Sequence, residues 1–326
     1  MKTRSFLQFV APSVLLMLAL LAVPLLMTLW LSVRSCMPAL ELVTVQQTGP
    51  FGAQTVTTQR ARTDAAGRVV ETCRFVGADY YQKILGLSGD APPSAAKPHN
   101  EFAAALGFTL LYIAATTPFI LGGGLLLALA ALHVTQRLKG VVIAASLLPF
   151  IITPVVGALA IKWLFRDNGL VPHLLSQVGV QVFWMAQAWS ARLLIILYGI
   201  WHVLPFAFIV FYAGLQSVPQ DSLEAATLDG ASRWQKLRYV TLPHMAPLIV
   251  FVTLIHLMDA YRVFEPVLVL TQGAFTTSVQ YLTYDILLHE DNPYKASAAA
   301  VLTLLGIAVL LVPLLRKTWR EQRQGF

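Results

Sequence analysis

Six stretches of the chain are long and apolar enough to cross a membrane. They cover approximately residues 8–31, 104–132, 141–164, 191–216, 247–270 and 296–315. A spanning helix needs about 20 mostly apolar residues, because its length must match the hydrocarbon core of a bilayer. Of the 326 residues, 57% are hydrophobic and only 12% are charged, far from the balance of a soluble domain. The sequence therefore predicts an all-α polytopic membrane protein with six transmembrane helices.

The first apolar run follows Lys2 and Arg4 and stays uncharged from Ser5 to Val33. It is longer than the roughly 7–15 residues of a secretory signal core, and no small-residue cleavage pattern follows it. We therefore expect an uncleaved first helix.

The basic residues predict an N-in, C-in orientation, because inner loops of membrane proteins carry an excess of Lys and Arg. The short outer loops carry only Arg166, Arg192 and Lys295. The inner ends carry Lys2, Arg4, Arg137, Lys139, Arg233, Lys236, Arg238, Arg316, Lys317, Arg320 and Arg323. The net charge of +7 forms no basic patch interleaved with aromatic residues, so nucleic acid is not an expected partner.

The long outer segment after the first helix, 34–103, contains a β-rich insertion at about 37–72. Thr and Val alternate with Gln and Arg there, and turn residues occur at 48–52 and 63–67, which predicts a three-stranded meander. The only two cysteines, Cys36 and Cys73, bracket the insertion and should face an oxidising compartment. A disulfide between them is expected, and two unrelated thiols are the alternative.

A polar segment, EAATLDGASRWQKLRYVTLPHMAP, separates the fourth and fifth apolar runs. Ser217 and Gln220 have capping-box spacing with Pro219 in the first turn, which predicts a short helix over 218–228. Gly230 then ends it, and Ser232 with Gln235 repeats the capping signal for a second short helix that ends near Leu242-Pro243. The two helices carry more apolar side chains than they can cover themselves. Physical reasoning leaves two partners open, another protein or lipid headgroups.

No enzyme signature is present. The sequence lacks a phosphate-binding G-x-x-x-x-G-K-[ST] loop, an H-E-x-x-H helix, cysteine pairs at metal spacing and a G-x-S-x-G elbow. Gly122-Gly123-Gly124 falls inside the second apolar run, where it favours close helix packing over phosphate binding. No metal and no catalytic residue is expected.

The polar segment resembles the EAA loop of permease subunits in bacterial ABC importers. The matching residues keep fixed spacing: Glu224, Ala225, Ala226, Gly230, Val240, Leu242 and Pro243. FVGADYYQKIL, LLPFIITPVVGALAIKWLFRDNGL, FYAGLQSVPQDSLEAATLDGAS and VFEPVLVLTQGAF extend the resemblance to the carbohydrate-uptake, maltose-type and binding-protein-dependent group. Val240 stands where the family usually has isoleucine, and the 37–72 insertion exceeds the usual outer loop.

The resemblance implies a type I ABC importer permease fold in the bacterial plasma membrane. It implies four kinds of partner: a second, non-identical permease subunit, a dimer of ATP-binding subunits, an extracytoplasmic solute-binding protein and membrane lipid. ATP and Mg would be bound by the ATPase subunits, and no cofactor by this chain. Glu224 would contact the ATPase, Gly230 would allow the turn between coupling helices, and Leu242-Pro243 would set the start of the fifth helix.

The fifth apolar run carries four ionisable residues, His256, Asp259, Arg262 and Glu265. Ionisable groups inside a span are costly and mark functional sites by default, and the i, i+3 spacing predicts one stripe facing the bundle interior. With Tyr261 and Phe264 beside it, the stripe suits a hydroxyl-rich ligand. The alternative is a structural role, in which Arg262 neutralises the two carboxylates.

Two further positions are less specific. Trp201 and His202, just before Pro205, indicate either a kink beside the pathway or a packing site. Lys162, near the outer end of the third run, is expected to snorkel to the interface.

The sequence therefore predicts the permease subunit of an importer for a sugar or polyol, and does not identify the solute. The alternatives are an ABC permease for a non-sugar solute and, in another class, a secondary transporter, which should show inverted repeats. The expected divisions are 1–33, 34–103, a core domain 104–315 with the coupling EAA loop 217–245, and a cytoplasmic tail 316–326.

Overall fold

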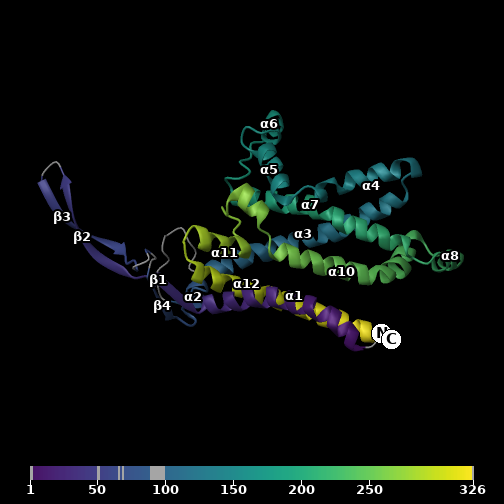
Figure 1. The fold of residues 1–326 in the computed structure, drawn as a ribbon. Coiled ribbons are helices and arrows are strands. Elements are labelled where there is room, and N and C mark those ends of the chain that lie inside the picture. The colour runs from purple at the N-terminus through teal and green to yellow at the C-terminus, as the bar shows by residue number, and fades with distance from the viewer. Residues whose placement is uncertain (1–2, 50–51, 65–66, 68–69, 89–99, 325–326) are drawn as a thin grey trace. The chain divides into compact units, whose positions relative to one another are not determined.

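The computed structural model describes residues 3–49, 52–64, 67, 70–88 and 100–324, and most of them are helical (Figure 1). The chain divides into two compact units. One holds Met1–Asn100 with Thr283–Leu302, and the other holds Glu101–Leu282 with Thr303–Phe326. The second unit contains every residue for which the sequence predicts a function, apart from the two cysteines.

Five helical stretches within the described residues are long and apolar enough to cross a membrane. They are α1 (Thr3–Ser32), α3 (Glu101–Leu132), α7 (Ala188–Gln216), the stretch Arg233–Tyr261, and α12 (Pro293–Gln324). Each overlaps one predicted run. The helix α12 continues through the predicted tail as far as Gln324, because Arg, Lys, Glu and Gln there are good helix formers and cations suit a helix C-terminus.

The third predicted span is not one continuous helix. It is split into α4 (Gln136–Ile151) and a stretch, Pro154–Gln177, that begins with α5 (Pro154–Phe165); α4 and this stretch meet at a bend of 93°. Ile152 and Thr153 are extended between them, and for Thr153 the reason is that a residue before proline avoids the helical region. A short helix, α6 (Leu170–Gln177), follows α5. Counted as one bent span, the pair gives up to six spans in the described part of the chain.

The fifth predicted span is displaced toward the N-terminus. The helix α9 (Arg233–Lys236) continues through a π-helical turn, η1 (Leu237–Thr241), into α10 (Leu242–Tyr261). The predicted helix end near Leu242-Pro243 is therefore wrong. Pro243 lacks an N–H and crowds the carbonyl four residues before it, and the wider π turn accommodates both effects without ending the helix.

Helices α3, α7 and α10 surround the core of the second unit, with Ile120, Phe208, Met245 and Val252 among its buried side chains. The backbones of α3 and α7 approach closely at the glycine triplet. A Cβ on Gly124 would lie 2.7 Å from the Cβ of Ala207, and a Cβ on Gly123 would meet Leu204, whereas Gly122 faces open space. The predicted packing role thus belongs to the second and third glycines.

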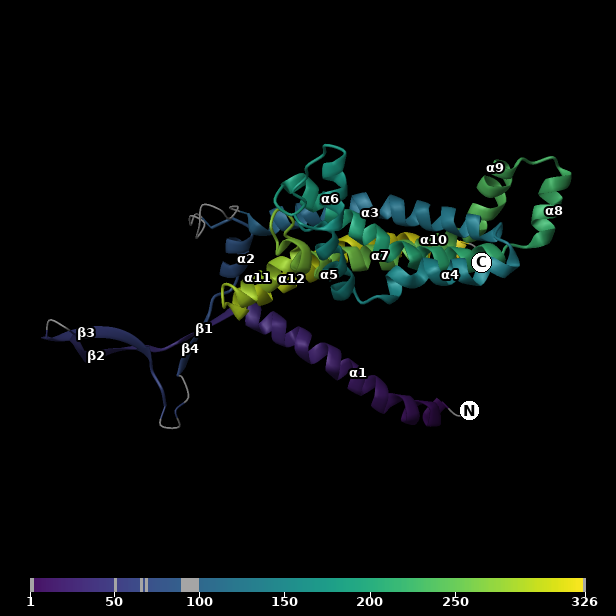
Figure 2. The same ribbon diagram turned by 90° about the horizontal axis from the view of Figure 1, so that it is seen from above.

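The first unit contains four strands in two antiparallel pairs. β1 (Arg34–Pro38) pairs with β4 (Glu71–Phe75), and β2 (Leu40–Gly49) pairs with β3 (Gly52–Ala61) to form a long two-stranded arm (Figure 2). The predicted three-stranded meander is wrong, because the chain after β3 returns to pair with β1 and not with β3. Of the predicted turn at 48–52, Pro50 and Phe51 lie outside the described residues.

Cys36 and Cys73 are opposite each other in the β1–β4 pair and are joined by a disulfide. The closed loop contains the whole β2–β3 arm, so the bond fixes the base from which the arm extends. In the chain-entropy model a loop of this size is stabilised by about 4 kcal/mol.

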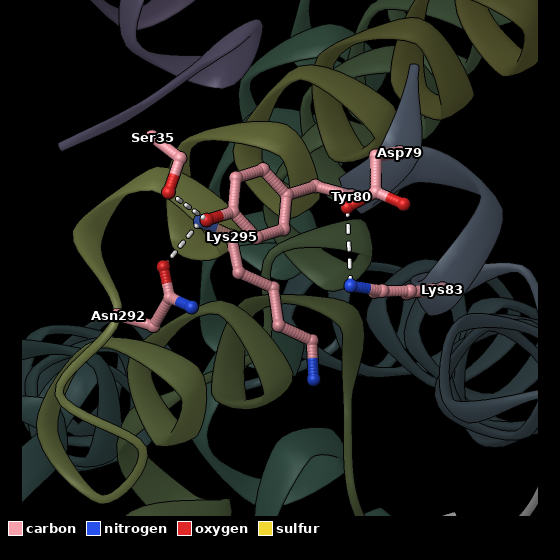
Figure 3. Close-up of polar contacts among 6 residues, drawn as sticks. All are labelled: Ser35, Asp79, Tyr80, Lys83, Asn292 and Lys295. Carbon is pink, nitrogen blue, oxygen red and sulfur yellow. Dashed lines mark hydrogen bonds and ion pairs between the residues drawn. The ribbon is translucent and has the colours of Figure 1, made fainter. Parts of the chain in front are cut away.

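Figure 3 shows polar contacts near this base and others at the start of α12. The helix α2 (Asp79–Ile84) places the Tyr80 hydroxyl 2.9 Å from Ser35 Oγ, to which it donates. Asn292 Oδ1 accepts from the backbone N–H of Lys295 at 2.9 Å, which caps the first turn of α12. A salt bridge from Lys83 to Asp79 at 3.1 Å lies within α2.

Candidate functional site

A cavity of about 450 Å³ lies within the second unit. Its wall is built from α3, α5, α7, the end of α10 and the segment that follows α10. The lining residues are Tyr112, Pro154, Tyr198, Gly199, His202, Val203, His256, Asp259, Ala260, Arg262, Val263, Phe264, Glu265, Pro266 and Gln280. Aromatic rings, carboxylates, imidazoles and a guanidinium thus surround one space, a mixture typical of a small-molecule site.

Five of the six residues predicted for the pathway line this cavity: His256, Asp259, Arg262, Phe264 and Glu265. They do not form the predicted stripe on one helix. The helix α10 ends at Tyr261, and the backbone of its C-cap, Arg262, has left the helical region at φ −100° and ψ 27°. The cavity gathers these side chains because the chain turns around it.

Tyr261 is the exception among the predicted pathway residues. It is 1% exposed and does not line the cavity. Its hydroxyl lies against Gly306 of α12, so close that a Cβ on this glycine would overlap it. Tyr261 therefore packs between helices, and its predicted place in the pathway stays a prediction that this cavity does not support.

The charged side chains of the cavity are solvent-accessible and weakly paired. Arg262 Nη2 lies 3.4 Å from Asp259 Oδ1, and the two side chains are 64% and 57% exposed. Such a pair contributes at most about 1 kcal/mol to stability. Two carboxylates and one guanidinium remain available to a ligand.

His256 is held in one tautomer by its neighbours. Thr116 Oγ1 donates to the Tyr112 carbonyl at 2.8 Å, so its oxygen accepts from His256 Nε2 at 3.2 Å. Nδ1 is then an acceptor, and it is buried without a hydrogen-bond partner among the described residues. A buried acceptor on a residue of the cavity wall favours a ligand that donates a hydrogen bond.

Sequence reasoning missed the two tyrosines of the wall, Tyr112 and Tyr198. An aromatic residue in an apolar helix predicts packing, and nothing local distinguishes one that faces a cavity. Gly199 beside Tyr198 is a partial signal, because the Tyr112 hydroxyl lies where a Cβ on that glycine would stand.

The EAA loop forms the second candidate site, and its turn is defined by backbone hydrogen bonds. The helix α8 (Gln220–Leu228) is followed by Gly230 at φ +74°. Gly230 N–H donates to the Thr227 carbonyl at 3.0 Å, and Ala231 N–H donates to the Ala226 carbonyl at 2.9 Å. These two hydrogen bonds, together with a residue in the left-handed conformation, form a Schellman motif, which glycine adopts at little cost.

The two capping predictions for the loop have different outcomes. Ser232 and Gln235 form a complete capping box at the start of α9, as predicted. Ser217 does not cap α8. It is the C-cap of α7, and its hydroxyl donates to the Gly214 carbonyl at 2.8 Å, while Pro219 is the N-cap of α8. Only three residues separate α7 from α8, and the Ser217 hydroxyl bonds to the end of α7 instead of the start of α8.

The loop exposes apolar surface. Within the described chain no side chain of α8 is buried, Leu228 is 90% exposed and Trp234 is 68% exposed. Lys236 Nζ donates to Thr227 Oγ1 at 2.7 Å, which ties α9 to α8. The predicted contact residues Glu224 and Ala225 are also exposed, and Ala226 is partly exposed. The helix pair is thus a defined structure with an uncovered face.

In the part of the chain that the structure describes, no group of three or more His, Cys, Asp or Glu side chains could hold a metal ion.

Comparison with known proteins gives a family and named relatives. Residues 94–324 match the model of the binding-protein-dependent transport system inner membrane component family. A trehalose/maltose transport system permease protein of Thermococcus litoralis is 35% identical over 162 residues, which are 48% of this chain and 55% of that protein. A trehalose transport system permease protein of Mycobacterium tuberculosis is 30% identical over 303 residues, 92% of this chain and 84% of the relative.

A solved structure shares the fold. It is a bacterial alginate ABC transporter in complex with an alginate pentasaccharide-bound periplasmic protein, and it matches with a TM-score of 0.63 and 25% identity over 75% of this chain and 83% of its own.

Proposed function

The chain belongs to the family of binding-protein-dependent transport system inner membrane components, and from this premise we propose that it is the permease subunit of an ATP-driven sugar importer. In this role the chain provides half of a membrane pathway and transmits movement from an ATPase. Catalysis of ATP hydrolysis belongs to partner subunits, which bind ATP and Mg.

The observation that carries the proposal is the EAA loop. A capped helix pair with an exposed apolar face, including Leu228 and Trp234, requires a partner surface. Glu224 adds an exposed carboxylate that suits a basic group on the partner. A cleft in each of two ATPase subunits would accept such a loop from each of two permease subunits.

The remaining partners follow from the family. The alginate transporter forms a complex with a periplasmic protein that carries its sugar. We propose a corresponding binding protein on the outer side here, a second and non-identical permease subunit, and a type I importer fold with both termini in the cytoplasm. The basic residues of the predicted inner loops support that orientation.

The cavity is the proposed solute pathway. Its carboxylates accept hydrogen bonds, its guanidinium donates them, and its tyrosine and histidine rings offer faces to a sugar ring. Asp259 and Glu265 together outweigh Arg262 in charge, so the wall favours a neutral sugar or polyol over an acidic one.

Copurification tests the proposal. A tagged chain expressed with the ATPase subunit of its importer should recover that ATPase, and Glu224→Arg combined with Gly230→Val should abolish the recovery. Asp221→Arg is the matched control, because Asp221 is an exposed carboxylate on the same helix outside the EAA residues. Recovery that survives the double change, or recovery lost equally in the control, would contradict the proposed docking.

A further inference from the structure

Two side chains of α7, Tyr198 and His202, reach the two sides of the break between α4 and α5. The Tyr198 hydroxyl donates to the Pro154 carbonyl at 2.7 Å, on the α5 side. His202 Nδ1 bonds to the Pro149 carbonyl at 2.8 Å, on the α4 side. The two rings are one helical turn apart and stacked, with centroids 5.6 Å apart and an interplanar angle of 11°.

The Pro149 carbonyl needs this bond. The last four carbonyls of a helix have no helical partner, and Pro149 belongs to the last turn of α4. Pro149 is partly buried among apolar helices, where an unsatisfied carbonyl would be costly. Because a carbonyl only accepts, the hydrogen lies on His202 Nδ1, and Nε2 of the neutral ring is left as an acceptor.

The approach of Tyr198 depends on Gly157, a buried residue of α5. A Cβ on Gly157 would lie 3.1 Å from the Tyr198 hydroxyl oxygen, closer than ordinary contact. Glycine therefore leaves the space in which the hydroxyl reaches Pro154. The absence of a side chain at Gly157 therefore allows the Tyr198–Pro154 hydrogen bond at the bend.

Both residues also line the cavity, together with Pro154 itself. The far part of α5 is tied to the segment that follows α10, since Lys162 Nζ donates to the Val269 carbonyl at 2.6 Å. Val269 lies in η2 (Val267–Thr271), which follows Glu265 and Pro266. Lys162 therefore does not simply snorkel as predicted. The helix α5 is held at one end by α7 and at the other by η2.

We propose that Tyr198 and His202 are positioning residues that set the bend between α4 and α5 and thereby the wall of the cavity. The inference rests on the proposed function only in taking the cavity as the solute pathway. The bend itself requires neither an ATPase nor a sugar to be measured, so its test is independent of the transport proposal.

The test is a distance measured by pulsed electron resonance across the bend. Spin labels at Leu138→Cys and Leu164→Cys lie on exposed positions of α4 and α5, and the native cysteines stay unlabelled in their disulfide. At the observed bend of 93° the two Cα atoms are about 25 Å apart, and one continuous helix over the same residues would separate them by about 39 Å. The full-length chain is measured in lipid nanodiscs with any subunits that copurify.

Tyr198→Phe removes only the hydroxyl and should shift part of the distribution to longer distances by several Å. Tyr198→Phe with His202→Leu should shift more of it, with about 14 Å as the limit of full straightening. Gly157→Ala leaves both side chains present but displaces the hydroxyl, and it should shift the distribution in the same direction. Tyr212→Phe, on α7 outside the cavity wall, should leave it unchanged.

Thermal unfolding of each variant shows whether a shift reflects the bend or loss of the fold. If the double variant does not fold, the two single variants decide the question. A distribution that stays at the length of the unmodified chain in Tyr198→Phe and Gly157→Ala, or that moves equally in Tyr212→Phe, would overturn the proposal.

Discussion

Replacement of Gly230 by valine isolates the backbone requirement of the EAA loop. Gly230 has φ +74°, and a Cβ at this position would meet no described atom within 4 Å. Valine therefore adds no clash, and its whole effect comes from the left-handed backbone. That conformation costs an L-residue about 1–2 kcal/mol, and β-branched residues are among the least tolerant.

This conformational cost determines the fraction of loops that keep the native turn. A cost of 1–2 kcal/mol lowers the fraction of loops with the native turn by a factor of about 5–30, relative to competing conformations. If the ATPase accepts only the native helix pair, its affinity for the permease should fall by about the same factor. Asparagine visits the left-handed region readily, so Gly230→Asn should weaken binding by less than about threefold.

The assay is a titration of the purified ATPase subunit against each permease variant in nanodiscs, with fluorescence or interferometry as the readout. Thermal stability should be nearly the same in all variants, because the loop is exposed and lies outside the core. Equal binding by the glycine and valine forms would refute the reasoning. So would equal losses in the valine and asparagine forms, since these differ mainly in their tolerance of a positive φ.

Three other changes have defined outcomes. Gly124→Ala should lower the unfolding temperature by several degrees, because overpacking costs about 1–3 kcal/mol. Gly122→Ala, in open space, should leave the unfolding temperature unchanged, and equal melting curves for the two variants would contradict the close α3–α7 contact. Cys36 and Cys73 should react with a maleimide in native membranes only after reduction, as counted by mass spectrometry, and labelling without a reductant would contradict the disulfide. Asp259→Asn should reduce sugar transport and sugar-stimulated ATP hydrolysis in reconstituted vesicles while changing stability by less than about 1 kcal/mol, and unchanged transport would exclude Asp259 from the pathway.

Local signals predicted the parts of the fold that depend on local physics. Apolar run length predicted the five continuous helices long enough to span a membrane, and the Ser232 capping box and the stop at Gly230 were predicted from residue types alone. The bend in the third span was missed although Pro149 and Pro154 are visible in the sequence. A proline in an apolar helix is often tolerated, and here the bend depends on donors supplied by a helix 44 and 53 residues further along.

The candidate cavity was predicted in part for a related reason. The spacing of Asp259, Arg262 and Glu265 was read as one face of a helix, whereas the helix ends at Tyr261. These charges still meet because the chain folds back over the same space. The packing of Tyr261 against Gly306 could not be predicted from the sequence. It is a contact between distant segments, and no periodicity within α10 reveals it.

The two candidate sites are connected by one continuous helix. The stretch Arg233–Tyr261 has 29 residues and so spans about 43 Å, from the capped turn at Ser232 to the cavity wall at Asp259. A load applied at the EAA loop therefore reaches the cavity without passing through a flexible linker. This stretch has two irregularities, the widened turn η1 and Pro247 inside α10, and the buried Thr241 and Met245 lie between or beside them and restrain bending there. Movement of the loop should consequently displace α10 as a rigid rod, and the cavity wall should change where that rod ends, at Arg262.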